Sequence, residues 1–354
     1  MRRLKRYICL VGLLALLAAA LTGCGFSDDS VEELFTLPRM AEEYTGLTQE
    51  LEALITQGYE YASPTGGRNI QSVQMADLDG DGQQEALAFF RMSSDEKPLK
   101  IFVFKIEGGS YARYCTIESS GTAIDSVYYQ DLNGDGRREL IVGWRISAEV
   151  QTVAVYTVAR EPVALMSSGY TRFTIQDLNG DGIPSLLVLR TDADSQPVAE
   201  FYGWQDEQMG VAYRCVLSST MASVNRGSLV SGRLDADTPA LYITGVDEQG
   251  MAATDILVFR QDLGLVNLAL SGSSTGVSNA VFPYRQLLPQ DINGDGIIEL
   301  PSPDTSWTAE QTDGLVSWLC CNGDGQLSTV AKTYHSLSCG WYFTIPESWW
   351  DWSV

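Results

Sequence analysis

Asp131-Leu-Asn-Gly-Asp-Gly-Arg-Arg-Glu139 indicates a repeat, because three similar nonapeptides recur along the chain. They are Asp77–Glu85, Asp177–Ser185 and Asp291–Glu299. The first aspartates of successive copies are 54, 46 and 114 residues apart, and the last interval is twice 57. Recurrence at about 50 residues is the signature of a repeat architecture, in which each unit packs on its neighbours.

A fifth copy lies half-way along the longest interval. Arg233-Leu-Asp-Ala-Asp-Thr-Pro239 keeps two acidic residues, has Arg233 in place of the first aspartate and lacks the following glycine. We interpret it as a decayed copy that no longer binds metal. Five periods therefore fit the chain best.

The residue types within each nonapeptide point to a hard cation. Asp or Asn fills positions one, three and five, Gly fills four and six, and three copies carry Glu at nine. Calcium takes six to eight oxygen ligands, and a Gly at six allows the turn that brings the backbone carbonyl of position seven inward. We expect about four calcium sites, of which the third is weaker because Ser185 replaces the glutamate. The candidate ligand residues are Asp77, Asp79, Asp81, Gln83, Glu85, Asp131, Asn133, Asp135, Arg137, Glu139, Asp177, Asn179, Asp181, Ile183, Asp291, Asn293, Asp295, Ile297 and Glu299.

An EF-hand and a simple turn between strands are the two alternative interpretations of these motifs. An EF-hand needs a bidentate Glu at position twelve, where this chain has Ala88, Val142, Val188 and Ser302, so that loop is excluded. Asn-Gly and Asp-Gly also form simple turns between strands. We expect only Asn322-Gly-Asp-Gly325 to be such a hairpin, because Cys320 stands at its first ligand position.

Strand-like runs follow the first three nonapeptides directly, at 86–90, 140–144 and 186–189, and further runs complete each period. The further runs are 99–106, 112–117 and 124–129 after the first copy, and 150–158, 162–167 and 172–175 after the second. Four short antiparallel strands in about 50 residues are typical of one propeller blade. The run at 69–75 is expected to be the last strand of a blade completed by the far end of the chain, which would close the ring.

The acidic motif and its period resemble the FG-GAP or VCBS repeats of integrin-like β-propellers over about residues 63–335. The resemblance implies an all-β fold with about five four-stranded blades and calcium in the nonapeptide loops. The chain departs from the family at the decayed copy, at Ser185 and in its last residues, 341–354.

The first residues predict export. A basic head, Met1–Arg6, precedes an uncharged apolar run from Ile8 to Leu21, which spans ~21 Å as a helix and is short for a ~30 Å membrane core. Leu21-Thr-Gly-Cys24 resembles the lipobox of bacterial lipoproteins, which implies cleavage before Cys24 and a diacylglycerol on its sulfur. We therefore expect a protein that is lipid-anchored to the cell membrane and faces the extracytoplasmic side.

The charge excludes several partners. The 354 residues include 23 basic and 45 acidic side chains, a net charge of −22, and loss of four basic residues with the signal would make it −26. Such a chain does not suit nucleic acid or a basic patch on an anionic membrane surface. An envelope protein or a glycan is the expected partner. Because 45% of the residues are hydrophobic, the chain is expected to fold.

The expected domains follow from these features. They are a signal peptide at 1–23, a lipidated tether at 24–43, a short amphipathic helix and lead-in at 44–62, the propeller at 63–340 and an aromatic tail at 341–354. Leu47, Leu51 and Leu54 have helical spacing and Gly58 follows as a cap, so the helix is expected to pack on the body. The five cysteines after Cys24 are interpreted as mostly buried thiols, with a disulfide from Cys339 to Cys320 or Cys321 as the alternative.

Catalytic patterns are scarce, and we predict a binding module rather than an enzyme. Gly272–Gly276 matches G-x-S-x-G and is followed by Asp291 and His335, but the required strand, elbow and helix are missing. The alternatives are an exported carbohydrate-active enzyme, since acids outside the loops are plentiful, and a structural envelope protein.

Tryptophans gather toward the C-terminus. Trp307, Trp318 and Trp341 lie in or beside strand-like runs and are expected to pack in the core. The tail tryptophans Trp349, Trp350 and Trp352 are the candidates for contact with a ligand.

Overall fold

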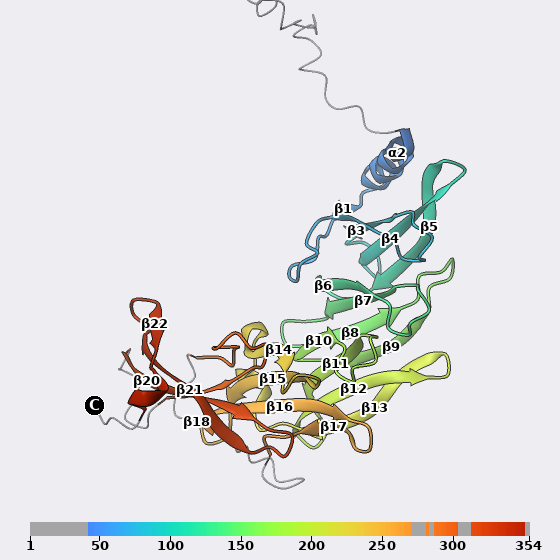
Figure 1. Cartoon of the computed structure of the whole chain (residues 1–354). Coiled ribbons are helices and arrows are strands. Elements are labelled where there is room, and N and C mark those ends of the chain that lie inside the picture. The colour runs from blue at the N-terminus through green and yellow to red at the C-terminus, as the bar shows by residue number, and fades with distance from the viewer. Residues whose placement is uncertain (1–41, 271–280, 283–286, 304–312, 351–354) are drawn as a thin grey trace, which may run out of the picture.

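The nonapeptides at 77–85, 131–139 and 177–185 each join two antiparallel strands of one sheet in the computed structural model, which describes residues 42–270, 281–282, 287–303 and 313–350. The nonapeptide at 291–299 is closed by a single antiparallel bridge between Gln290 and Glu299. The chain forms five antiparallel sheets that follow one another in sequence order and lie along an arc (Figure 1). The prediction of five β-sheet periods of about four strands is confirmed.

The strands have the following bounds. The first sheet contains β1 (Glu60–Tyr61), β2 (Val73–Ala76), β3 (Glu85–Arg91), β4 (Leu99–Glu107) and β5 (Ser110–Ser119). The second contains β6 (Ala123–Gln130), β7 (Glu139–Arg145), β8 (Gln151–Tyr156) and β9 (Ala164–Gly169), and the third contains β10 (Arg172–Gln176), β11 (Ser185–Thr191), β12 (Pro197–Gln205) and β13 (Gln208–Val216). The fourth contains β14 (Leu229–Arg233), β15 (Pro239–Val246), β16 (Ala252–Arg260), β17 (Gly264–Asn267) and β18 (Val281–Phe282), and the fifth contains β19 (Leu300–Pro303), β20 (Asp313–Cys321), β21 (Leu327–Ser336) and β22 (Trp341–Thr344).

The predicted boundary between repeats is wrong. β2 pairs with β3 from Val73 opposite Ala88 to Ala76 opposite Glu85, so it belongs to the first sheet and is not the last strand of a sheet completed from the C-terminal end. The physical reason is that the nonapeptide is a tight turn, which reverses the chain and makes its flanking strands pair with each other. The first and last sheets lie at opposite ends of the arc in Figure 1.

Apolar residues hold neighbouring sheets face to face. One core cluster joins the first two sheets through side chains such as Phe89, Val103 and Val142, and corresponding clusters join each later pair. The second strand of each of the first two sheets, β3 and β7, is buried along almost its whole length because it is covered on both faces. This explains why its sequence is a continuous apolar run rather than an alternating one.

The predicted N-terminal helix is confirmed as α2 (Glu42–Thr56), and it covers the outer face of the first sheet (Figure 1). Leu47 and Leu54 are buried there against a cluster that includes Phe90 and Phe102. The Gly58 N–H donates to Ile55 O and the Tyr59 N–H to Leu54 O, which is the Schellman pattern. Gly58 has φ +94°, which glycine adopts without strain.

The C-terminal sheet ends in an edge strand. Trp318 is fully buried as predicted, whereas Trp341 on β22 is 48% exposed, so the packing predicted for it is wrong. β22 pairs with β21 on one side and is exposed along its whole length, because no other described strand pairs with it or covers it. Trp307, at a position predicted to pack, lies outside the described residues, as do Trp352 and the region 1–41 that includes Cys24.

No helix among the described residues is long and apolar enough to cross a membrane. The five cysteines at 115, 215, 320, 321 and 339 are free, so the alternative disulfide is not formed. Burial raises the pKa of Cys115 to about 12 and that of Cys321 to about 11, whereas Cys339 is exposed. The prediction of buried thiols is therefore confirmed in part.

The single histidine provides a test of this packing. His335 is buried, its ring stacks on Tyr342, and its Nε2 lies 2.8 Å from the Thr333 hydroxyl. Burial lowers the pKa of His335 below 6.5, so the unfolded chain binds this proton more readily. The resulting stability is present above about pH 6.5 and is lost as the pH falls through the folded-state pKa.

We expect a one-histidine NMR titration of the untagged protein to give a folded-state pKa below 6.5. A pKa at or above that value would show that the imidazole is not held in this packed, uncharged site.

Candidate metal centres

The four intact nonapeptides share one loop geometry, and we call them loop one (77–85), loop two (131–139), loop three (177–185) and loop four (291–299). In loop two, Asp131 Oδ1 accepts from the Gly134 N–H at 2.6 Å and Oδ2 from the Gly136 N–H at 2.8 Å. The aspartate at position one makes the same two bonds in the other three loops. Both glycines have positive φ, at +77° and +85° in loop two, a conformation that side chains disfavour.

Positions three and five tighten the turn further. In loop two, Asn133 Oδ1 accepts from the Asp135 N–H at 2.9 Å and Asp135 Oδ1 from the Arg137 N–H at 2.8 Å. These are Asx turns, in which a short polar side chain bonds to the backbone two residues on. In loop one, this backbone bond from Gln83 is the main reason that the pKa of Asp81 is lowered. These bonds turn side-chain oxygens of positions three and five toward the inside of the loop.

The glutamate at position nine reaches back across the loop. Glu139 Oε2 accepts from the Leu132 N–H at 2.8 Å, and Glu85 and Glu299 make the same bond at position two of loops one and four. All three carboxyl groups belong to buried residues, and desolvation raises their pKa. Ser185 in loop three replaces this carboxylate.

The apolar residue at position two anchors the loop to the core. Leu78, Leu132 and Leu178 are buried, and so is Leu234 of the decayed copy. The turn at 233–239 thus keeps its anchor after losing the ligand pattern. Arg233 takes over part of the lost role, because its Nη1 donates to the Ala236 carbonyl at 2.9 Å.

Loop one gathers enough carboxylates to hold a cation. Ligand atoms of Asp77, Asp79 and Glu85 all lie within 4.8 Å of one another. Glu85 Oε1 is buried and accepts no hydrogen bond, so this part of the carboxylate is desolvated without compensation from a donor. A divalent ion would meet that requirement with the residues present.

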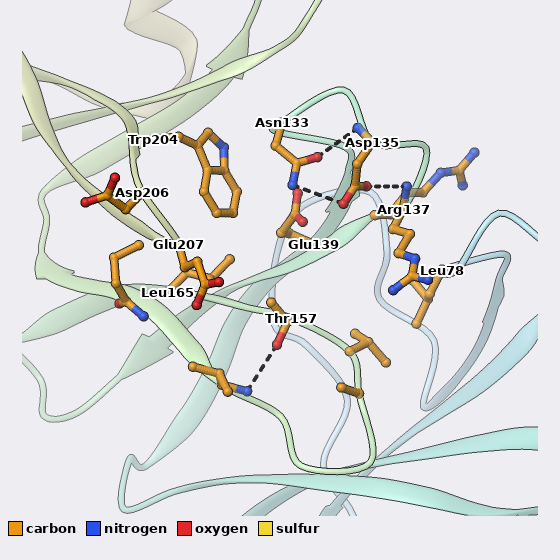
Figure 2. A pocket seen from close by; sticks show the side chains of 15 residues that line it. Leu78, Asn133, Asp135, Arg137, Glu139, Thr157, Leu165, Trp204, Asp206 and Glu207 are labelled. Atoms are coloured by element: carbon orange, nitrogen blue, oxygen red, sulfur yellow. Dashed lines mark hydrogen bonds between the residues drawn. The ribbon is translucent and has the colours of Figure 1, made fainter.

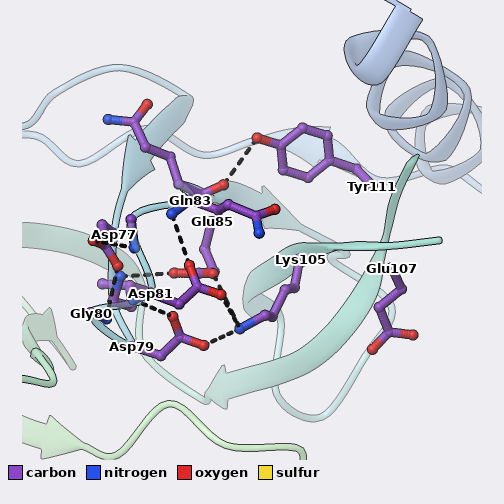
Figure 3. A network of polar contacts seen from close by, with 12 residues as sticks. Asp77, Asp79, Gly80, Asp81, Gln83, Glu85, Lys105, Glu107 and Tyr111 are labelled. Atoms are coloured by element: carbon purple, nitrogen blue, oxygen red, sulfur yellow. Dashed lines mark hydrogen bonds and ion pairs between the residues drawn. The ribbon is translucent and has the colours of Figure 1, made fainter. Parts of the chain in front are cut away.

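A lysine from the neighbouring strand enters loop one (Figure 3). The Lys105 ammonium forms an ion pair with Asp79, and its Nζ lies 3.3 Å from Asp81 Oδ2 and 3.8 Å from Glu85 Oε1. The hydrogen bond to Asp79 is the largest cause of its raised pKa. Lys105 is therefore an internal cation that competes for the carboxylates of loop one.

Sequence reasoning missed Lys105, because it lies on β4 and no local spacing relates it to the nonapeptide. Strand register supplies the relation. Lys105 follows Phe104, which pairs with Ala86, the residue directly after loop one. The corresponding positions beside loops two and three are Thr157 and Gly203, and neither residue is basic. Beside loop four the corresponding position is Cys320. Of the four loops, only loop one has a basic residue at this register position.

Neighbouring loops touch one another along the array. The Arg138 N–H of loop two donates to Leu78 O of loop one at 2.7 Å. A Cβ on Gly80 would lie 2.5 Å from the carbonyl oxygen of Gly136, so this close approach requires glycine. The first two loops form one continuous edge.

A cavity of about 710 Å³ lies beside loop two (Figure 2). Asp135 and Glu139 line it from the loop, and Asp206 and Glu207 line it from the turn between β12 and β13. The indole N–H of Trp204 donates to Leu132 O at 2.7 Å and so ties this turn to the loop. Arg137 and Arg138 also line the cavity, so its four carboxylates exceed its guanidinium groups by two charges, which favours cations over anions.

The other sequence candidates fall elsewhere. Asn322–Gly325 is the hairpin between β20 and β21, closed by Asn322, which confirms the prediction. Gly272–Gly276 lies outside the described residues, while the buried His335 contacts Thr333 and Asp291 binds backbone N–H groups of its own loop.

The tail tryptophans differ in exposure. Trp349 lies in η4 (Glu347–Trp349) and is 58% exposed. Trp350 is half-buried, its indole N–H donates to Ile345 O, and the Lys332 ammonium lies 5.6 Å from its ring centroid. Of this pair, Trp349 presents more surface to a ligand.

No protein-family profile matches the chain, and no curated protein matches it. Similar solved structures include a PL11 rhamnogalacturonan lyase from Bacillus licheniformis, with 16% identity over 77% of this chain and 51% of the lyase at a TM-score of 0.40. A hypothetical protein from Leishmania major has 10% identity over 82% and 91% at a TM-score of 0.29. A GDP-Man-dependent mannosyltransferase from Leishmania mexicana has 9% identity over 87% and 97% at a TM-score of 0.20. This chain spans about half of the lyase, and similarity this distant assigns no activity.

Removing the lysine charge tests its competition with a bound ion. We expect Lys105→Met to raise the divalent-cation affinity of loop one by about tenfold or more, because the ion no longer displaces an ammonium from the carboxylates. Isothermal titration calorimetry measures the change, and Lys97→Met, which removes an equal charge from an exposed turn, is the matched control. Equal affinities in both variants would contradict the competition.

Proposed function

We propose that this protein is a lipid-anchored, extracytoplasmic binding module whose sheet array is stabilised by calcium in loops one to four. The observation that carries the proposal is the buried glutamate at position nine. In loop one its second oxygen, Glu85 Oε1, accepts no hydrogen bond and lies among ligand atoms of Asp77 and Asp79, with the Lys105 ammonium 3.8 Å away as a partial counter-charge. Carboxylate oxygens gathered in this way require a cation or protons to offset their repulsion.

Calcium fits the donor set best among common divalent ions. Every side-chain donor at positions one, three, five and nine is an oxygen, and no histidine or cysteine occurs in the nonapeptides. Calcium accepts irregular sets of six to eight oxygens, whereas magnesium demands near-octahedral geometry and retains waters. Asp131, Asn133, Asp135, the carbonyl of Arg137 and Glu139 would hold the ion in loop two.

Calcium would act mainly on stability. Extracellular calcium modules bind at about 10⁻⁴–10⁻³ M, so ~1 mM calcium adds about 0.4–1.4 kcal/mol per site by mass action. Four ions would also lower the mature net charge from −26 to about −18. Less self-repulsion within an acidic chain favours the folded state.

The sheet array supports a propeller-type arrangement as part of this proposal. The second and third sheets are four-stranded meanders that carry the loop between their first and second strands, and the strands β6, β10 and β14 lie on the concave side of the arc (Figure 1). Small-angle X-ray scattering in calcium would distinguish a closed ring from an open arc. A radius of gyration fitting the open arc would reject the closed ring.

Chelation tests the calcium sites. We expect excess EGTA to lower the melting temperature of the mature protein by several degrees, because the stabilisation by calcium at all four sites is removed together. Differential scanning calorimetry measures the shift. An unchanged melting curve, together with no calcium in elemental analysis after dialysis, would contradict the proposal.

Asp135→Ala resolves a single site. We expect it to reduce bound calcium by about one equivalent, measured by elemental analysis at about 1 mM calcium. Asp324→Ala is the matched control, because Asn-Gly-Asp-Gly occurs in both places but the hairpin at 322–325 lacks the other ligands. Equal loss in the two variants would refute site-specific binding.

The anchor is tested separately. We expect Cys24→Ser to move the protein from the membrane fraction to the soluble fraction of expressing cells, because two acyl chains hold a protein on a bilayer that a single chain binds only marginally. Labelling with a fatty-acid analogue checks the modification. Retention of the variant in the membrane fraction would argue against lipidation at this cysteine.

The binding role rests on the exposed surface of the array. Trp349, together with the exposed Trp341 and Phe343, presents aromatic side chains beside the last sheet. Aromatic rings with a polar handle are favoured at contact surfaces. A glycan array with Trp349→Ala against the wild-type protein tests this contact, and equal binding would exclude Trp349 from the ligand site.

A further inference from the structure

An arginine-lined cavity of about 540 Å³ lies at the end of the sheets opposite the loops. The loops follow the last residues of β2, β6 and β10, whereas the cavity is formed near the start of β6, at the end of β7 and at the start of β10. Thr65 and Gly66 from the lead-in and Arg226 from η3 (Arg226–Ser228) complete it. Segments from four parts of the chain therefore converge on one cavity.

Asp125 on β6 organises two of the arginines. Its Oδ1 accepts from Arg145 Nη2 at 3.1 Å, and its Oδ2 accepts from Arg226 Nη2 at 2.8 Å and from the Tyr170 hydroxyl at 3.2 Å. Asp125 is buried, whereas the side chains of Arg145 and Arg226 are 38% and 54% exposed. A guanidinium has five N–H donors, so each arginine keeps donors beyond the one that Asp125 accepts.

Two further donors in the cavity have no partner. Arg172 donates from Nη1 to Thr171 O at 2.6 Å, but its Nε is buried and makes no hydrogen bond. Ser126 is 1% exposed, lines the cavity, and its hydroxyl is also unpartnered. An unsatisfied buried polar group costs ~1–3 kcal/mol. Both atoms lie behind the cavity surface, so a ligand acceptor would reach them only after a change of side-chain rotamer.

The charge of the cavity is opposite to that of the chain. Three arginines and one aspartate line it, a net charge of +2, while the whole chain carries −22. Arginines presented side by side are suited to carboxylate and phosphate groups because their planar forks match these anions. The positive charge of the residues that line this cavity therefore suits it to an anion.

Aromatic rings form another part of the wall. Phe173 meets Tyr170 edge-to-face with ring centroids 5.0 Å apart, and Tyr128 at 5.6 Å. All three residues line the cavity together with the polar Gln151 and Thr65. Such a mixture of rings, hydroxyls and an amide suits a polyhydroxylated ring, and the volume lies in the range of small-molecule sites.

We propose that this cavity binds a carboxylate-bearing sugar unit, with the carboxylate on Arg145, Arg172 and Arg226. Asp125 acts as a positioning residue that holds two of these arginines. The inference names a ligand class for the proposed binding module and rests on that proposed function, but it does not depend on calcium in the loops.

The test uses the mature full-length protein in calcium and three probes in isothermal titration calorimetry. We expect glucuronate to bind and its neutral analogue glucose to bind at least tenfold more weakly, because only the former supplies a carboxylate to the arginines. Inorganic phosphate, the third probe, shows whether the arginines prefer a phosphate to a carboxylate. Tighter binding of phosphate than of glucuronate, or equal binding of glucuronate and glucose, would overturn the assignment.

Variants locate the site. Arg226→Gln and Arg145→Gln should each weaken glucuronate binding at least tenfold and leave the melting temperature within about 2 °C, since both side chains are partly exposed. Arg160→Gln is the matched control, because Arg160 is exposed and pairs with Glu107. Unchanged glucuronate affinity in both cavity variants would reject the site.

Elemental analysis of the same wild-type protein, together with a glucuronate titration in excess EGTA, separates this inference from the calcium proposal. Normal glucuronate binding by a protein that holds no calcium after dialysis would overturn the calcium sites alone, and normal calcium binding without glucuronate binding would overturn the ligand assignment alone.

Discussion

The hydrogen bond that the backbone N–H at position two donates to a buried glutamate is the constraint that holds three of the four loops to the sheets. Glu139 begins β7 and Leu132 is buried in the core, so the bond between them ties the loop to the strand and the strand to its neighbouring sheet. The same bond recurs at Glu85 and Glu299. It also buries a carboxylate, which is costly without compensation. Structure and cation chemistry are therefore linked through one side chain.

The loops and the sheets were predictable to different degrees. The spacing of Asp131, Asn133 and Asp135, with glycines between them, predicts both the turn and the inward oxygens, since these are local properties of the chain. Strand pairing is not local. The run at 69–75 could pair with the strand after loop one or with a strand from the C-terminal part of the chain. The tight turn of loop one makes it pair with β3. The packing predicted for Trp341 is wrong because a strand-like sequence does not reveal whether another element covers the strand.

Side chains contributed from another strand or another sheet lay beyond sequence reasoning. Lys105 reaches loop one through strand register, and Arg226 reaches Asp125 across 101 residues. Neither belongs to a motif. Lys105 and Arg226 are each paired with a carboxylate, as expected in a chain with so many acidic residues. Arg233 differs, because it donates to a backbone carbonyl of its own loop.

The two ends of the sheets consequently have opposite character. Acidic loops form one end, and a cavity with net charge +2 opens near the other, although the chain as a whole carries −22. An anionic ligand approaching such a protein is repelled at long range and attracted only within about a Debye length of the arginines. Cations in the loops would reduce the long-range repulsion without touching the cavity. Calcium would then help ligand binding through the overall field, a weak and salt-dependent effect, while the arginines held by Asp125 supply the specificity.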